Sequence, residues 1–124
     1  MRIIIALVLA TLTLHAADIT GVWRYDGMPD STVIICQEGT KVVIAAQHPY
    51  EGKSSAIIFS GIGTFDGEKI SIDLKIVRRP TPTYGGSNGI THEDLVLSAD
   101  GATLTGSWRN DIGQGAAAVL RRLN

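Results

Sequence analysis

The sequence predicts an all-β fold: an eight-stranded antiparallel up-and-down β-barrel that follows an N-terminal signal peptide. Three observations support this prediction. From residue 19 onward, apolar and polar residues alternate with a period of two, and no helical stripe is present. Short β-branched or aromatic runs are separated by Gly, Asp, Asn and Pro clusters. Most separating segments are short, Gly-bearing hairpin turns, which favour an up-and-down order, and barrel closure removes exposed sheet edges. A two-sheet sandwich is the alternative.

Residues 1–16 have the three parts of a secretory signal peptide. Arg2 precedes an apolar run over residues 3–14, and small residues follow at Ala16 and Ala17. The run is too short to span a bilayer as a helix. We therefore expect cleavage after Ala16, a single domain over residues 17–124, and a secreted or periplasmic location. A buried N-terminal strand or helix is the alternative.

The charge of the chain argues against a nucleic-acid partner, and its cysteine content argues against an internal disulfide. The chain has 124 residues, a formal net charge of -1 and one cysteine. Such a balanced charge does not suit a partner rich in phosphates, so we expect no nucleic acid, and no later segment is a candidate membrane span. One cysteine cannot form an internal disulfide. Because Cys36 follows the apolar residues 33–35, we expect a buried, unreactive thiol.

The first four predicted strands cover residues 19–26, 31–37, 41–48 and 56–64. The first carries a Gly-x-Trp pattern, and the next three are rich in β-branched residues, which favour strands. The alternation in the third predicts that three residues face the core, namely Val42, Ile44 and Ala46.

The last four predicted strands cover residues 69–78, 89–98, 102–110 and 114–123. The fifth strand alternates most clearly, with Ile70, Ile72, Leu74 and Ile76 on one face and Ser71, Asp73 and Lys75 on the other. In the sixth strand the same parity points Thr91, Glu93, Leu95 and Leu97 inward.

The connection over residues 79–89 is longer than the others. It contains two Pro, three Gly and the isolated Tyr84. Long loops in compact barrels often act as lids or binding loops, so Tyr84 is a candidate contact residue. A loop with no role is the alternative.

Few residues suggest chemistry. After residue 16 the histidines are His48 and His92, and the sequence has no metal-binding or nucleophile motif, so we expect no cofactor, no metal and no enzyme activity. His92 and Asp94 are expected to pair on the outer face. Glu93 faces inward near the barrel mouth, where it could bind a polar or cationic ligand group, although a solvated position at the rim is the alternative.

A near repeat contains both tryptophans. Residues 20–24 read Thr-Gly-Val-Trp-Arg, and residues 105–109 read Thr-Gly-Ser-Trp-Arg. In each copy Gly and Trp share a face, so the glycine permits close approach of a neighbouring backbone or ring. Trp23 and Trp108 are therefore candidates to fill the core or to stack on a ligand.

The first and last strands resemble those of lipocalins and the wider calycin group. Gly21-x-Trp23, together with Arg121 and Arg122, is similar to the signature in which a Trp packs at the closed barrel end beneath a basic side chain. A closer likeness is to small secreted bacterial β-barrel modules that occur alone or ahead of α/β-hydrolase domains. Residues 19–23 also resemble the first strand of avidin-like proteins, with Asp26 and Ser31 near that family's ligand-bonding positions, but no Trp occurs between 23 and 108.

These observations predict a non-catalytic barrel that binds a small, mainly apolar molecule. Small strand residues suggest interior space, namely Ala45, Ala46, Gly61, Gly63, Gly106 and residues 116–118. The candidate ligand-binding residues are Trp23, Tyr25, Tyr84, Glu93 and Trp108. The alternative is a protein-interaction module, such as an inhibitor of a secreted hydrolase, that uses its loops and Arg78, Arg79 and Tyr84.

Overall fold

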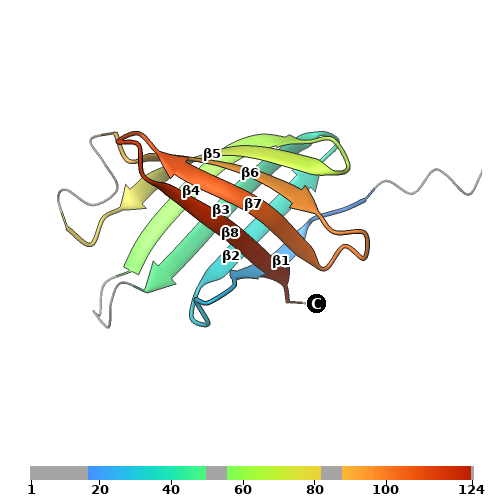
Figure 1. Cartoon of the computed structure of the whole chain (residues 1–124), viewed down its shortest axis with the longest axis horizontal. Coiled ribbons are helices and arrows are strands. Elements are labelled where there is room, and N and C mark those ends of the chain that lie inside the picture. The colour runs from blue at the N-terminus through green and yellow to red at the C-terminus, as the bar shows by residue number, and fades with distance from the viewer. Residues whose placement is uncertain (1–16, 50–55, 82–87, 124) are drawn as a thin grey trace, which may run out of the picture.

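Eight antiparallel strands form a closed barrel in sequence order (Figure 1). The structure is a computed structural model that describes residues 17–49, 56–81 and 88–123, so the predicted signal peptide over residues 1–16 lies outside the described residues. The strands are β1 (Gly21–Tyr25), β2 (Thr32–Glu38), β3 (Lys41–Pro49), β4 (Ala56–Phe65), β5 (Lys69–Arg78), β6 (Ile90–Leu97), β7 (Thr103–Asn110) and β8 (Gly115–Arg122). The predicted fold class is confirmed, and each predicted strand overlaps an observed one.

Seven of the eight strand pairings join neighbours in sequence, and the eighth closes the barrel. In that closing pair, Trp23 lies opposite Arg122 and Tyr25 lies opposite Leu120. A closed barrel leaves no free sheet edge with which another chain could pair.

The two ends of the barrel differ. The turns β2–β3, β4–β5 and β6–β7 lie at one end, together with residues 17–20 and the end of β8, and we call this the closed end (Figure 1). Strands β1, β3, β5 and β7 finish at the opposite end, which we call the open end.

The inward faces of the strands agree with the alternation in the sequence. Val42, Ile44 and Ala46 of β3 are buried, as are the four alternating apolar residues of β5. The outward residues between them are mostly exposed. Burial of large aliphatic side chains removes apolar surface from water and is the main term that stabilises such a core.

Trp23 fills the closed end. Its side chain is fully buried, and its indole N–H donates a hydrogen bond to the carbonyl oxygen of Ile19 at 3.0 Å. The guanidinium of Arg122 lies over the indole, 4.6 Å from the ring centroid. The Trp-beneath-Arg arrangement that the lipocalin likeness implies is therefore present at this end.

Three inward glycines allow neighbouring strands of the wall to pack closely. They do not create interior space, which corrects the expectation that small strand residues at these positions widen the barrel interior. A Cβ atom added to Gly61 would overlap the carbonyl oxygen of Asp73 on β5. Gly63 and Gly106 are blocked in the same way by the backbones at Ser71 and Asp94. Glycine at these positions allows a neighbouring strand to approach where any side chain would collide.

Cys36 is exposed, so the expectation of a buried thiol was wrong. In β2, Val33 and Ile35 point inward, and the pleat therefore turns Cys36 outward. The apolar neighbours in sequence were misleading because Ile34, which shares the outer face with Cys36, is itself 47% exposed.

Candidate functional site

The open end of the barrel contains a cavity of about 460 Å³. Its walls are mainly apolar or aromatic and include Met28, Phe59, Leu74, Ile76, Trp108, Ile112 and Ala118. A smaller set of polar residues also lines it, namely Tyr25, Asp26, His48, Thr91, Glu93, Asn110 and Gln114. The cavity lies above the packed closed end, so the barrel interior is filled in one half and hollow in the other.

Strand pairing brings the polar and aromatic residues of the cavity together. Glu93 of β6 lies between Ile72 of β5 and Trp108 of β7 in the sheet, and all three face the interior. Tyr25 is the last residue of β1, two positions after Trp23 and therefore on the same inward face. Tyr25 thus stands one layer above the Trp23 plug.

Tyr25 and Glu93 form a hydrogen bond across the barrel. The Tyr25 hydroxyl donates to Oε1 of Glu93 at 2.7 Å. Glu93 is only 3% exposed, and burial raises the pKa of its carboxyl, although the Tyr25 hydrogen bond and the nearby His92 oppose that shift. Burial, together with the adjacent carboxylate, also raises the pKa of Tyr25 well above its usual range, so the phenol keeps its proton.

His48 extends this group on the other side of Tyr25. The two rings meet edge to face with centroids 4.8 Å apart, and Phe59 packs beyond His48 at 5.3 Å. Among the described residues, the buried Nδ1 of His48 has no hydrogen-bond partner. Burial lowers the pKa of His48, so the imidazole is uncharged at neutral pH.

The cavity has an acidic character. Two carboxylates lie among the described lining residues, and one of them, Asp26 at the mouth, pairs with Arg121, with 3.0 Å between Nε and Oδ1. Glu93 lies deeper, and within the described ranges Tyr25 is the one side chain that bonds to its carboxylate. No lysine or arginine lies among the described residues that line the cavity.

The predicted site residues fall into three groups. Tyr25, Glu93 and Trp108 line the cavity together. Trp23 lies in the closed end, beneath the cavity and outside its lining. Tyr84 lies outside the described residues. Ser31, which the avidin likeness singled out, is buried in the β1–β2 connection, where its hydroxyl bonds to the backbone of Met28 and Tyr25.

Sequence reasoning missed His48 and Phe59. The signal for His48 was present, because it continues the inward series Val42, Ile44 and Ala46 by one more step of two. Phe59 faces inward from β4 just where the pairing with β5 shifts register, an irregularity that the sequence does not reveal.

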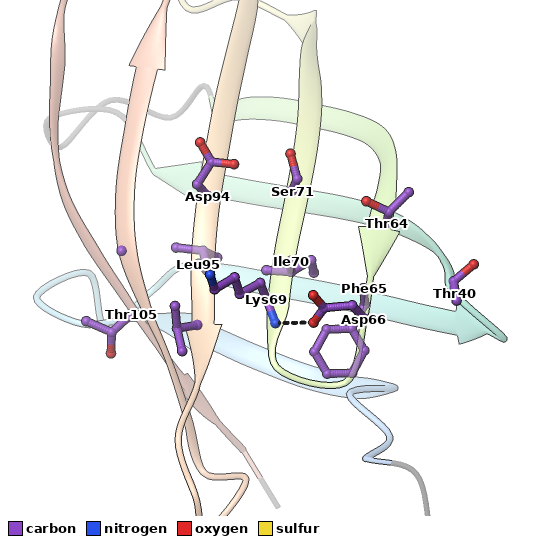
Figure 2. A pocket seen from close by; sticks show the side chains of 12 residues that line it. Thr40, Thr64, Phe65, Asp66, Lys69, Ile70, Ser71, Asp94, Leu95 and Thr105 are labelled. Carbon is purple, nitrogen blue, oxygen red and sulfur yellow. Dashed lines mark hydrogen bonds between the residues drawn. The ribbon is translucent and has the colours of Figure 1, made fainter.

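A second hollow, of about 440 Å³, lies on the outer wall over β4–β7 near the closed end (Figure 2). Figure 2 shows short polar side chains along it, among them Thr64, Ser71, Asp94 and Thr105. The backbone N–H of Lys69 donates to Asp66 at 2.7 Å at the adjoining turn. This groove is open to solvent and adjoins no buried charged side chain in the parts of the chain that are described, so the interior cavity is the stronger candidate.

His92 lies between two carboxylates on the same outer wall. Its Nδ1 is 2.7 Å from Asp73, and its Nε2 is 3.0 Å from Asp94, so the expected pairing with Asp94 is confirmed. The hydrogen bond with Asp73 raises the pKa of His92. The Ser71 hydroxyl is 3.5 Å from Nε2, but Asp94 is closer to that nitrogen, so His92 is not free to activate the serine.

The described ranges lack two further features. No group of three or more His, Cys, Asp or Glu side chains there is arranged to hold a metal ion. No helix in the same ranges is long and apolar enough to cross a membrane.

The chain was compared with known protein families and with curated proteins. No family model matches the chain, and no curated protein sequence matches it significantly.

Proposed function

We propose that this protein binds a small, mainly apolar molecule in the cavity at the open end of the barrel. The observation that carries this proposal is the cavity itself, which combines apolar and aromatic walls with a few polar groups at fixed positions. Sites for small molecules in proteins have this composition, and their volumes are typically about 300–1,000 Å³.

The packing around the cavity supports a preformed site. Below it, Trp23 and the aliphatic core seal the closed end. Along its sides, Phe59, Leu74 and Ile76 are held by the continuous β3–β6 sheet and are each 8% exposed or less. A rigid apolar wall loses little conformational entropy when a ligand binds, which favours affinity.

We also propose that the chain is a lipocalin-like protein of the secreted or periplasmic space. The closed eight-stranded barrel is compatible with that group. The position of Arg122 over Trp23 supports the likeness further. The signal-like composition of residues 1–16 is the basis for the proposed location.

The proposal is tested by filling the cavity. Ala118 is 5% exposed and lines the cavity, so Ala118→Phe would occupy part of the space. Nile red, an uncharged fluorescent probe, is expected to bind the native protein saturably at one site. Its affinity should fall at least tenfold in Ala118→Phe and by less in Ala118→Val, a smaller change that protects the test against misfolding.

The matched control is Ala45→Phe, because Ala45 faces outward on β3. That variant should bind Nile red like the native protein, and circular dichroism should show the same β structure in all variants. No saturable binding to the native protein, or equal binding by Ala118→Phe and Ala45→Phe, would contradict the proposal.

A further inference from the structure

We propose that the ligand of this cavity is a small apolar amine whose positively charged nitrogen binds the carboxylate of Glu93. This inference rests on the proposed function, since it concerns the same cavity, and it adds the chemical class of the ligand.

The first step is the geometry of Glu93. Its side chain lines the cavity and is 3% exposed. Oε1 accepts the hydrogen bond from Tyr25, whereas Oε2 makes no hydrogen bond with any described residue. The carboxylate is therefore held in one orientation by Tyr25, with an acceptor oxygen still available to a donor in the cavity.

The second step is the charge around that oxygen. A buried carboxylate is costly unless a cation compensates for it, and the described lining contains no lysine or arginine. Asp26 has its own partner in Arg121, and His48 is uncharged. A ligand cation would supply the missing countercharge, whereas a ligand carboxylate would be repelled.

The third step is the shape and chemistry of the walls. Tyr25, His48, Phe59 and Trp108 give the cavity an aromatic lining around Glu93. The faces of aromatic rings attract cations, and the remaining aliphatic wall suits a hydrocarbon body. A molecule with one ammonium group and an apolar chain or ring matches both features.

The test compares three probes that share one chain length: hexylamine, 1-hexanol and hexanoic acid. Titration calorimetry near pH 7.5 is expected to show that hexylamine binds at least tenfold more tightly than hexanol, and that hexanoic acid binds most weakly. Charge-assisted hydrogen bonds to a buried carboxylate are strong enough to produce such a preference.

Glu93→Gln keeps the size of the side chain and removes its charge. This variant should lose the preference for the amine, so that its affinities for hexylamine and 1-hexanol lie within about twofold of each other. The matched control is Asp94→Asn, the same type of change at the next residue, which faces outward. Asp94→Asn should keep the preference.

The outcomes separate the two proposals. The amine assignment would be overturned if the native protein bound the amine and the alcohol equally, or if the preference survived in Glu93→Gln. In either case, saturable binding of Nile red would still support the proposed function. A native protein that binds none of the probes would overturn both.

Discussion

Arg122 connects the segment before the first strand with the end of the last strand at the closed end of the barrel. Besides lying over Trp23, its guanidinium donates to the carbonyl oxygens of Asp18 at 2.8 Å, Thr20 at 3.1 Å and Gly101 at 3.1 Å. The planar guanidinium of an arginine holds its donors in a fixed fork, which suits several acceptors around one plane. Arg122 therefore ties the segment before β1 and the β6–β7 turn to the end of β8.

Arg122→Ala should destabilise the barrel by about 2–3 kcal/mol, because it removes a cation–π contact and leaves carbonyl groups without their donors. Arg121→Ala is the matched control: Arg121 forms an exposed ion pair with Asp26, so its loss should cost less than about 1 kcal/mol. Urea unfolding of both variants measures the difference. Equal costs would show that Arg122 contributes no more than a surface charge.

Glu93→Gln should stabilise the ligand-free protein at neutral pH. Burial raises the pKa of Glu93 above its ordinary value near 4.5, so between that value and the raised pKa the folded state binds more protons than the unfolded state. Stability conferred by this group is therefore lost as the pH rises from about 4.5 through the raised pKa. Two titratable groups share the cavity with Glu93: Tyr25, which stays protonated, and His48. His92 lies on the outer side of β6 and lowers the pKa of Glu93 through its charge.

Urea unfolding at pH 4 and pH 8 checks this prediction. The variant and the native protein should be nearly equal at pH 4, and the variant should be about 1–2 kcal/mol more stable at pH 8, the cost of an uncompensated buried carboxylate. If Glu93→Gln were less stable than the native protein at pH 8, the buried carboxylate would stabilise the fold, and the prediction would be wrong.

At the scale of the element, β4 shows how a strand of this barrel is shaped. Its inward residues change from Ile57 and Phe59 to Gly61 and Gly63 and back to Phe65. The large side chains lie near the two ends of the strand, and the glycines lie where the backbone of β5 comes closest. Glycines at such positions introduce the curvature that lets a sheet close into a barrel.

Gly61→Ala should destabilise the protein by about 3 kcal/mol or more, since the new methyl group would collide with backbone that cannot move away alone. Ser60→Ala, one residue earlier on the exposed face, should change stability by about 0.5 kcal/mol or less. Thermal unfolding of the two variants makes the comparison. If Gly61→Ala matched Ser60→Ala, the close approach of β4 and β5 would be in error.

The alternation in each strand made its faces predictable, whereas contacts between distant strands were not. A period of two assigns every residue of β5 to a face, and the observed burial agrees. The same rule would have placed Cys36 outward, and the error came from giving its apolar neighbours more weight than parity. The Tyr25–Glu93 hydrogen bond joins residues 68 positions apart on non-adjacent strands, so only the closed cross-section reveals it.

For the whole molecule, the β1–β8 seam decides whether the sheet is a barrel. The other pairings are hairpins that can form locally, but the seam joins the first strand to the last. Three residue pairs are in register across it, including Trp23 with Arg122, and one backbone hydrogen bond flanks them on each side. Closure therefore depends on a short contact that includes the closed-end plug.

A chain that spans residues 17–124 should keep the cooperative unfolding of the full chain, because that range contains all eight strands of the barrel. A chain that ends at Ala118 should lose it, since it lacks Leu120, Arg121 and Arg122, the register partners of β1 in the seam. Circular dichroism with urea unfolding distinguishes the two. A cooperative transition in the shorter chain would show that the seam is dispensable.

The positions of residue 17 and of the end of β8 have a practical consequence for the use of this molecule. Residue 17 and the end of β8 both lie at the closed end, where Arg122 bonds to Asp18, while the cavity opens at the other end. A resin, an electrode or a fused reporter attached at the carboxyl end would hold the protein with its mouth facing the sample. Immobilised in this way, the barrel can be presented to mixtures of candidate ligands, and captured molecules can be eluted and weighed.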